Sequence, residues 1–418
     1  MAKCKLTDIL LVGTIGGFLM IGGCSEKAPV KTEIIPTTGV FSEADEAFYL
    51  RRYDILVEAF KTGQETTKYD TEITFGDELS SRPLPRKDLD PNLKGVLETL
   101  KDQSSQNRTA SLIVYSDGAV VSESYFGDTN ADTLINSKSL AKPLGVVAIG
   151  RAIEAGFIES LDQSVADFIV EWQGTDKAAI KIRHVLDMRS GLKAQGNAQG
   201  PGDVLNRAYL HPRHDEVIIH EYPLDHPPGT RYDYSNVNSE LVSVLIARAT
   251  GLPYQDWLTK EVMQPMGMAG GKIWLNQVGG LAHSGCCIGL PSETYLKLAV
   301  LVLQGGEWEG KSFLPDSFIK EMVTATPQNI HVGMGVYNGK TYAEYRGAAN
   351  PDVSFGRTYH SEPYVDDDII LFDGNGHQVA FILPKRNMII MRLGKAPRKG
   401  ITWDNAYIPN LMARQLDQ

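Results

Sequence analysis

Three serines of the chain are each followed by a lysine three positions later, a spacing that can turn a serine hydroxyl into a nucleophile. A serine hydroxyl is hardly ionised at neutral pH, so it needs a nearby base, and a lysine desolvated among apolar residues can lose its proton and act as one. About one such match is expected by chance in a chain of this size, so context must separate the pairs. They are Ser139 with Lys142, Ser190 with Lys193, and Ser317 with Lys320.

The context favours Ser139. It stands at the start of an apolar helical pattern, so its hydroxyl can lie at the positive end of a helix. Lys142, one turn later, would lie on the same helix face. Ser190 is followed by Gly191, which is typical of a turn, and Ser317 belongs to an amphipathic helix. Ser139 and Lys142 are therefore the predicted nucleophile and base. The alternative is a helix-capping serine with a surface lysine.

A second candidate group is Tyr234-Ser235-Asn236, which follows a Pro-Pro-Gly-Thr segment at 227–230 and precedes a helical pattern. A tyrosine phenol beside a lysine can have its pKa lowered and can then exchange protons near neutral pH. The alternative is a simple turn before a helix, with Asn236 as its local cap.

Three segments together resemble the penicillin-binding-protein-like serine hydrolases. This family includes class C β-lactamases, family VIII esterases, D-alanyl-D-alanine peptidases and 6-aminohexanoate-dimer hydrolases. The order and spacing of the segments match the family, and the resemblance extends over about 111–393. The segments are SLAKP at 139–143, IRHVLDMRSGL at 182–192 and PGTRYDYSN at 228–236.

The resemblance implies a role for each residue of the first two motifs. Ser139 would be the acylated nucleophile, and Lys142 would take its proton. Tyr234 would be the second base or the proton shuttle to the leaving group, and Asn236 would hold the substrate or Lys142 by hydrogen bonds. The resemblance also implies the β-lactamase/DD-peptidase-like fold, of α/β (mixed α and β) class, and catalysis without a metal or cofactor.

The third motif of the family departs from its usual pattern. Its usual form is Lys or His, then Ser or Thr, then Gly, on the strand lining the site. Here the sequence DGNGHQ occupies 373–378. A lysine at that place recognises the carboxylate of a β-lactam or of D-alanyl-D-alanine, and Asp373 or Gly374 removes this charge complement. The departure favours ester or amide hydrolysis, although His377 can still offer positive charge.

The glycines of this motif keep a structural use. Gly374 and Gly376 allow a close approach of the backbone, and the Asn375 amide can join that of Ser139 in an oxyanion hole. The motif resembles the Gly-x-x-Gly-Gln variants of the esterase and amide-hydrolase branches. The alternative is a glycine-rich strand turn that contacts no substrate.

Two further groups of side chains carry weaker signals. The histidines and aspartates between 211 and 226 follow no helical metal-ligand spacing, so we interpret them as a loop bordering the site rather than as a metal centre. Tyr209 and Tyr222 of the same region are candidates for substrate contact. The Cys286-Cys287 pair predicts small buried packing, with a vicinal disulfide as the alternative. The first group comprises His211, His214, His220, His226, Asp215 and Asp225.

The elements that must position these residues follow from hydrophobic periodicity. An Asp-Gly turn between two β-rich runs predicts a hairpin near the start of the catalytic region, and three strands are expected near the end. The simplest assembly is an antiparallel sheet formed from both chain ends, with flanking helices and a helical middle subdomain. The region 66–91 looks irregular, and 337–364 looks like a loop near the site. Helices are expected at 43–62, 142–156, 239–251, 293–305 and 403–416, and strands at 112–115, 119–126, 368–372, 378–383 and 388–393.

Composition bounds the class of protein. The chain has 418 residues, 42% of them hydrophobic, and a formal net charge of -10. It can bury a large core, and its acidity argues against nucleic acid as the partner. Its four cysteines, at 4, 24, 286 and 287, form neither a disulfide framework nor a thiolate zinc module.

The N-terminus predicts export. Two lysines and an uncharged apolar run at 9–23 suit a signal peptide, and the Ile-Gly-Gly-Cys ending at Cys24 resembles a bacterial lipobox. The predicted organisation is a lipoprotein signal peptide at 1–23, a tether at 24–42, an N-terminal extension at 43–105 and a serine hydrolase domain at 106–418. The protein would be lipid-anchored on the periplasmic side of the envelope, and Ser25 hints at the outer membrane. An uncleaved anchor or an ordinary secretory signal is the alternative.

These observations predict a serine hydrolase that cleaves ester or amide bonds of a small-molecule substrate through an acyl-enzyme on Ser139. A β-lactamase or D-alanyl-D-alanine peptidase is the enzymatic alternative, and a non-catalytic binding lipoprotein is the alternative from another class. The loops at 194–226 and 337–365 are expected to form the pocket walls. The sequence leaves the oligomeric state open.

Overall fold

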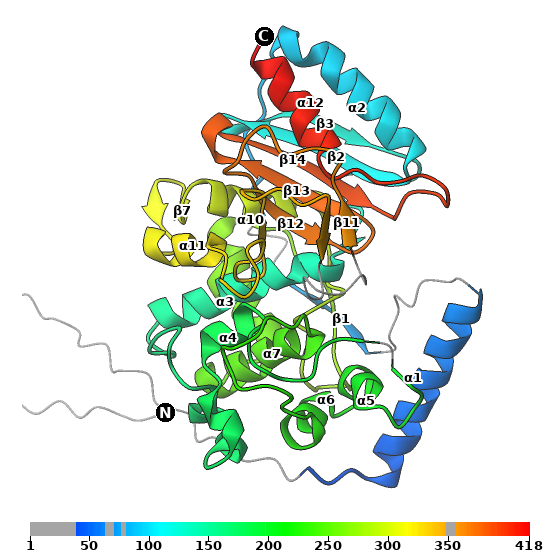
Figure 1. Ribbon diagram of the computed structural model, residues 1–418, viewed down its shortest axis with the longest axis vertical. Coiled ribbons are helices and arrows are strands. Elements are labelled where there is room, and N and C mark those ends of the chain that lie inside the picture. Colours follow the sequence, from blue (N-terminus) through cyan, green and yellow to red (C-terminus); the bar gives the residue numbers. More distant parts are fainter. Residues whose placement is uncertain (1–38, 63–70, 77–80, 197, 348–356) are drawn as a thin grey trace, which may run out of the picture. The chain divides into compact units, whose positions relative to one another are not determined.

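The central sheet is built from both ends of the catalytic region. The predicted hairpin forms at Asp117 and Gly118, whose φ angles of 47° and 88° suit a tight hairpin turn. The sheet is antiparallel throughout, in the order β3-β2-β14-β13-β12-β9, and the β2–β14 pairing joins its two halves (Figure 1). The predicted fold class is confirmed. The strands are β2 (Thr109–Ser116), β3 (Ala119–Tyr125), β9 (Tyr337–Asn338), β12 (Ile370–Gly374), β13 (Gln378–Leu383) and β14 (Met388–Gly394).

The computed structural model describes residues 39–62, 71–76, 81–196, 198–347 and 357–418. These residues all belong to one compact unit that spans Thr32–Gln418. The predicted signal peptide, Cys24 and most of the tether lie outside the described residues.

Successive side chains of a strand point to opposite faces of the sheet. Both faces of the central sheet carry apolar side chains, and different helices cover each face. Leu112 and Val114 pack in one hydrophobic cluster with residues of α2 (Lys94–Gln106) and α12 (Tyr407–Leu416). Ile113 and Tyr115 point to the opposite face and join the larger cluster, which includes the buried side chains of the helical middle. In Figure 1, α2 and α12 lie together on one side of the sheet and α10 on the other.

The helical middle of the chain contains the three segments at 139–143, 182–192 and 228–236 on which the family resemblance rests. Its longest helices, α3, α7 and α10, are buried along most of their length, and α7 buries the polar side chains of Asn238, Ser239, Glu240 and Ser243 as well as apolar ones. The helix predicted at 239–251 ends as expected, with Gly251 in the left-handed region at φ 74°. The helices of this part are α3 (Ala141–Glu154), α4 (Ile182–Leu186), α5 (Val204–Leu210), α6 (His214–Glu216), α7 (Asn236–Thr250), α8 (Tyr254–Leu258), α9 (Gln264–Met266), α10 (Ser292–Leu303) and α11 (Asp316–Val323).

The N-terminal part packs against the catalytic body. Helix α1 (Glu43–Thr62) coincides with the prediction, and its Glu46 accepts two hydrogen bonds from Arg207 of α5, at 2.8 and 2.9 Å. The region expected to be irregular contains a strand, β1 (Glu72–Phe75), which pairs with β5 (Gly271–Trp274). Because its partner lies far along the chain, no local signal reveals this strand.

A second, smaller sheet joins β1 and β5 to the segment before Ser139. Its order is β1-β5-β6-β4, with β6 at Gly289–Leu290 and β4 at Ile135–Asn136. The polar region after β9 also contains a short hairpin of β10 (Tyr345–Gly347) and β11 (Arg357–Tyr359). The remaining hairpin is β7 (Glu307–Trp308) with β8 (Lys311–Ser312).

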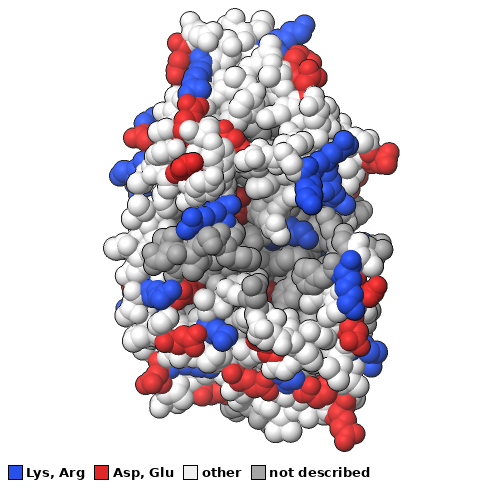
Figure 2. All heavy atoms as spheres, turned by 45° about the vertical axis from the view of Figure 1, so that its right-hand side comes forward, with Lys and Arg blue, Asp and Glu red and all other residues white. Residues whose placement is uncertain are grey.

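Charges of both signs are interspersed over the face drawn in Figure 2, and acidic side chains are more frequent towards its lower edge. Among the residues with described placement, no helix is both long and apolar enough to cross a membrane.

Candidate active site

Ser139 stands in a tight turn between the small sheet and a helix. The chain leaves β4, forms a single 3-10 turn at Lys138–Leu140 and continues as α3. Lys138 has a left-handed φ of 49°, and its amide donates a hydrogen bond to Asn136 Oδ1 at 3.1 Å. This turn places Ser139 at the N-terminal end of an apolar helix, as the sequence predicts.

The residues of the first two motifs converge on the Ser139 hydroxyl. Ser139 Oγ lies 2.8 Å from the hydroxyl of Tyr234, and Lys142 Nζ lies 3.3 Å from the same Oγ. Lys142 Nζ also lies 5.0 Å from the centre of the Tyr234 ring. Two proton-transfer groups therefore contact one hydroxyl, which is the arrangement that an activated serine needs.

Lys142 is held from two further sides. Its Nζ donates to Asn236 Oδ1 at 3.1 Å and to the carbonyl oxygen of Gly285 at 3.0 Å, and the residue is only 8% exposed. Together with Ser139 Oγ, these two oxygens surround the amine and hold it against the serine hydroxyl. Asn236 thus orients Lys142, which is one of the two roles that the family resemblance implies.

A cavity of about 540 Å³ opens onto the serine. Residues of the third motif form one wall of it. A Cβ added to Gly374 would approach Leu140 Cδ1 to 2.5 Å, so a larger residue here would have to displace the Leu140 side chain beside the Ser139 turn. Lys142 lies behind the serine and is not part of the lining. The predicted residues that line the cavity are Ser139, Tyr234, Asn236, Gly374, Asn375, Gly376 and His377.

His377 lies in this wall with its pKa lowered by burial. Burial lowers its pKa below 6.5, against the raising effect of Asp373, and the ring stacks on Trp403 with centroids 5.2 Å apart. The surroundings of His377 therefore disfavour its positively charged form.

Several lining residues were not identified from the sequence. Arg346 of β10 is buried, forms an ion pair with Asp373 of β12, and lies with its guanidinium 4.1 Å from the Tyr337 ring centre. Arg357 and Gln195 also line the cavity. These three residues lie in the two loops, 194–226 and 337–365, that the sequence predicted as pocket walls. The sequence did not indicate which residues of the loops line the cavity.

Other candidates from the sequence lie elsewhere. Ser190 is buried and accepts a hydrogen bond from the Leu192 amide, and Lys320 forms an exposed ion pair with Asp316. The described lining of the cavity includes none of the histidines between 211 and 226. Tyr222 is buried and donates to the Lys193 carbonyl at 3.0 Å rather than contacting the cavity.

Cys286 and Cys287 are joined in a vicinal disulfide, the alternative to simple buried packing. Cys286 lines the cavity, and Tyr209 contacts Cys287 Sγ at 3.6 Å instead of lining it. The preceding residue, Gly285, supplies the carbonyl that holds Lys142. The disulfide thus lies directly beside one anchor of the lysine.

Gln378, at the start of β13, ends the third motif, and the sequence indicated no role for it. Its hydrogen bonds indicate a positioning role. Its Nε2 donates to the carbonyl of Asn136 at 2.8 Å, and its Oε1 accepts from the Gly394 amide at 3.2 Å. The side chain therefore ties the segment before Ser139 to the central sheet.

We expect Gln378→Leu to lower kcat by about 10- to 100-fold with little change in KM, because the serine loses its fixed position while the cavity stays open. Steady-state kinetics on an activated ester would measure this split. Gln255→Leu, which removes another buried glutamine on α8, is the matched control and should stay near wild type. Equal kcat in the two variants would contradict the positioning role.

The comparisons with known proteins concern the family and the fold. Residues 94–285 match the family model described as Beta-lactamase. No curated protein matches the chain significantly. Solved structures share the fold at low sequence identity. A protein from Bacillus anthracis assigned as a 6-aminohexanoate-dimer hydrolase is 16% identical, with a TM-score of 0.59, over 94% of this chain and 97% of its own.

Two further solved structures are similar to the chain. A penicillin-binding protein homologue from Caulobacter crescentus is 16% identical, with a TM-score of 0.58, and the match covers 79% of this chain and 99% of that one. EstCE1, described as a hydrolase with promiscuous acyltransferase activity, is 16% identical, with a TM-score of 0.57, over 78% and 99% of the two chains. The family model and the shared fold confirm the resemblance on which the motif assignment rests.

Proposed function

We propose that this chain, whose residues 94–285 match the family model described as Beta-lactamase, is a serine hydrolase that cleaves ester or amide bonds of small molecules through an acyl-enzyme on Ser139. The observation that carries the proposal is the contact of one cavity-facing hydroxyl with two proton-transfer groups, Tyr234 at 2.8 Å and Lys142 at 3.3 Å. A capping serine with a surface lysine would not have this environment.

In the first half of the reaction, Ser139 Oγ attacks the substrate carbonyl carbon and its proton passes to Lys142. The tetrahedral intermediate then collapses, the bond to the leaving group breaks, and Tyr234 hands a proton to the departing alcohol or amine. The product of this half is an ester of Ser139. The amides of Ser139 and Asn375 are the donors that we assign to the oxyanion.

In the second half, water replaces the leaving group. The Tyr234–Lys142 pair takes a proton from water as it attacks the acyl carbon, and Ser139 regains its proton when the acyl group leaves as a carboxylic acid. An acyl-enzyme can also pass its acyl group to another acceptor, and EstCE1, one of the similar structures, is described as having acyltransferase activity.

The charge arrangement supports esters or amides over β-lactams. A β-lactam carries a carboxylate that needs a free cation in the third motif, and Asp373 stands in this motif. The buried Arg346 is already engaged by Asp373. The cavity volume of about 540 Å³ lies in the range that suits a small molecule.

We also propose that the chain is exported and anchored by a lipid on Cys24. The apolar run at 9–23 and the small residues before the cysteine support this. Metabolic labelling with a fatty-acid analogue should mark the wild-type protein and fail to mark Cys24→Ser.

The function is tested on the full chain, purified in detergent, with p-nitrophenyl butyrate and nitrocefin. We expect a burst of nitrophenol followed by steady turnover, and a mass increase of one butyryl group on the tryptic peptide that contains Ser139 during the reaction. Nitrocefin should remain intact. Turnover of nitrocefin would favour the β-lactamase alternative, with Arg357 or Lys138 as the carboxylate contact. A bound but unaltered ester with no mass increase would contradict catalysis and favour a binding protein.

A further inference from the structure

A second cluster of polar side chains lies buried behind the active site. His214 of α6, Glu240 of α7 and His283, in the segment between β5 and β6, are 0%, 1% and 1% exposed. Each of them offers one ligand atom, and these three atoms lie within 4.8 Å of one another. Only His214 of this cluster belongs to the sequence grouping of histidines between 211 and 226, and its two partners come from other segments.

The ligand atoms lie at, or slightly beyond, the separations found in a metal site. Glu240 Oε2 lies 3.3 Å from His283 Nδ1 and 3.8 Å from His214 Nε2. In a tetrahedral site with metal–ligand bonds of about 2.0–2.2 Å, ligand atoms are separated by about 3.3–3.6 Å. The rings of the two histidines are stacked, with centroids 4.6 Å apart and 14° between their planes. An imidazole nitrogen binds a metal in the plane of its ring, so one ring must tilt for both to hold the same ion.

The hydrogen bonding of the cluster is incomplete. Neither ring nitrogen of His214, nor Glu240 Oε1, has a hydrogen-bond partner among the described residues. Buried polar atoms are nearly always satisfied, and each lost partner costs about 1–3 kcal/mol. The other oxygen, Glu240 Oε2, accepts a hydrogen bond from the Ser284 amide at 3.2 Å, which fixes the carboxylate. A cation bound to His214 Nε2 would satisfy that nitrogen, and bidentate binding by the carboxylate would satisfy Glu240 Oε1.

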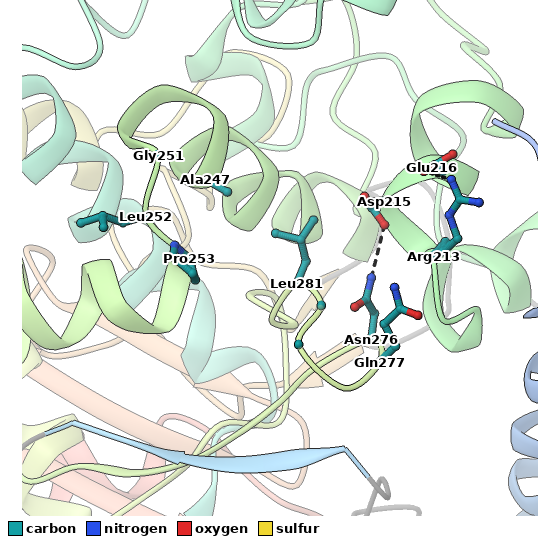
Figure 3. A pocket seen from close by; sticks show the side chains of 12 residues that line it. Arg213, Asp215, Glu216, Ala247, Gly251, Leu252, Pro253, Asn276, Gln277 and Leu281 are labelled. Carbon is teal, nitrogen blue, oxygen red and sulfur yellow. Dashed lines mark hydrogen bonds and ion pairs between the residues drawn. The ribbon is translucent and has the colours of Figure 1, made fainter. Parts of the chain in front are cut away.

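The neighbours of His214 do not compete for such a cation. Arg213 and Glu216 pair with each other, and Asp215 accepts a hydrogen bond from Asn276 at 3.2 Å (Figure 3). These side chains line a separate cavity of about 330 Å³ beside the cluster. The ligand set is therefore two imidazoles and one carboxylate.

We propose that His214, Glu240 and His283 bind a divalent transition metal of the zinc type. Imidazole and carboxylate ligands suit Zn²⁺, whereas Ca²⁺ and Mg²⁺ prefer oxygen ligands alone. A water or Glu240 Oε1 completes the coordination. The metal would tie α6, α7 and the 275–288 segment together, and it is a structural site because it lies outside the cavity that contains Ser139.

The proposed metal site also contacts the segment and the helix that hold Lys142 of the active site. Ser284 and Gly285 directly follow His283, and the Gly285 carbonyl holds Lys142 at 3.0 Å. A Cβ on Gly285 would approach Glu240 Oε1 to 3.0 Å, so this segment packs tightly on the cluster. Glu240 lies one turn after Asn236, the other anchor of the lysine.

The test measures metal directly and does not depend on hydrolysis. We expect the full chain, purified in detergent without chelator, to contain about one zinc per chain by plasma mass spectrometry. After removal of zinc by a chelator, the Tm should fall, and added Co²⁺ should give the visible absorption bands of a tetrahedral site and restore the Tm.

The variants His214→Ala and Glu240→Gln should each weaken zinc binding by at least about 100-fold, since loss of a residue that merely orients a ligand already costs about 10- to 100-fold. His211→Ala removes a buried histidine of the same segment, which packs on Phe41, and should bind zinc like the wild type. A folded wild-type chain with no zinc and no Co²⁺ bands would overturn the proposal and leave a buried cluster of polar side chains without a metal. The decisive measurements are the zinc content and the Co²⁺ absorption of the wild-type chain. A variant that fails to fold therefore does not change the conclusion.

Discussion

Ser139→Ala is expected to lower kcat by on the order of 10⁴- to 10⁶-fold on any ester or amide that the wild type cleaves, because no acyl-enzyme can form without the hydroxyl. The fold should be retained. The alanine loses a hydrogen bond with Tyr234 at 2.8 Å and one with Lys142 at 3.3 Å, which changes the free energy of unfolding by about 1 kcal/mol each. Steady-state kinetics and thermal unfolding of the purified variant would measure both effects.

The matched control is Ser317→Ala, which changes a serine with the same spacing to a lysine on the exposed side of α11. It should keep the wild-type kcat. Retention of more than a tenth of wild-type turnover by Ser139→Ala would exclude Ser139 as the nucleophile. Identical losses in both variants would point to an effect on folding instead.

The sequence predicted the sheet and the long helices because their signals are local. Hydrophobic periodicity and terminal glycines delimit elements such as α3 and α7, and the Asp117–Gly118 turn specifies the first hairpin. Strand β1 has only four residues, and its pairing partner β5 comes from another part of the chain. Helix α2, although included in the expected extension, packs on the central sheet and lies within the family match, which begins at residue 94.

The residues of the candidate site also fall into those that the sequence identified and those that it did not. Ser139, Lys142, Tyr234 and Asn236 stand in short motifs whose spacing is visible, and the structure brings all four together. The pair of Arg346 and Asp373 exists only because β10 and β12 meet at the cavity. Such contacts depend on tertiary packing, which no linear spacing encodes.

The same limit explains the buried cluster. The sequence argument compared histidines that are close along the chain, since metal motifs on one helix or loop have fixed spacings. His214 instead meets Glu240 and His283, each from a different segment. A metal site assembled from three segments leaves no pattern that a reader of one sequence could recognise.

Lys142→Met is expected to lower kcat by about 10²- to 10⁴-fold, the range that general acid–base catalysis contributes. Methionine fills a similar volume but can neither accept the serine proton nor donate to Asn236 Oδ1 and the Gly285 carbonyl, which lie 3.1 and 3.0 Å from Nζ. Acylation should be slowed at least as much as deacylation. Single-turnover release of nitrophenol from p-nitrophenyl butyrate would measure the acylation rate directly.

Two further variants test whether Lys142 acts as a base or only as a fixed positive charge. Lys142→Arg keeps the positive charge, but a guanidinium cannot act as a base in water, so this variant should be as slow as Lys142→Met. Lys142→Ala opens space behind the serine, and added alkylamines should restore part of its acylation rate with a dependence on amine concentration. Lys320→Met, which removes an exposed lysine paired with Asp316, is the control and should keep full activity. If Lys142→Arg retained the wild-type rate, the lysine would act by its charge alone, and Tyr234 would be the group that takes the serine proton.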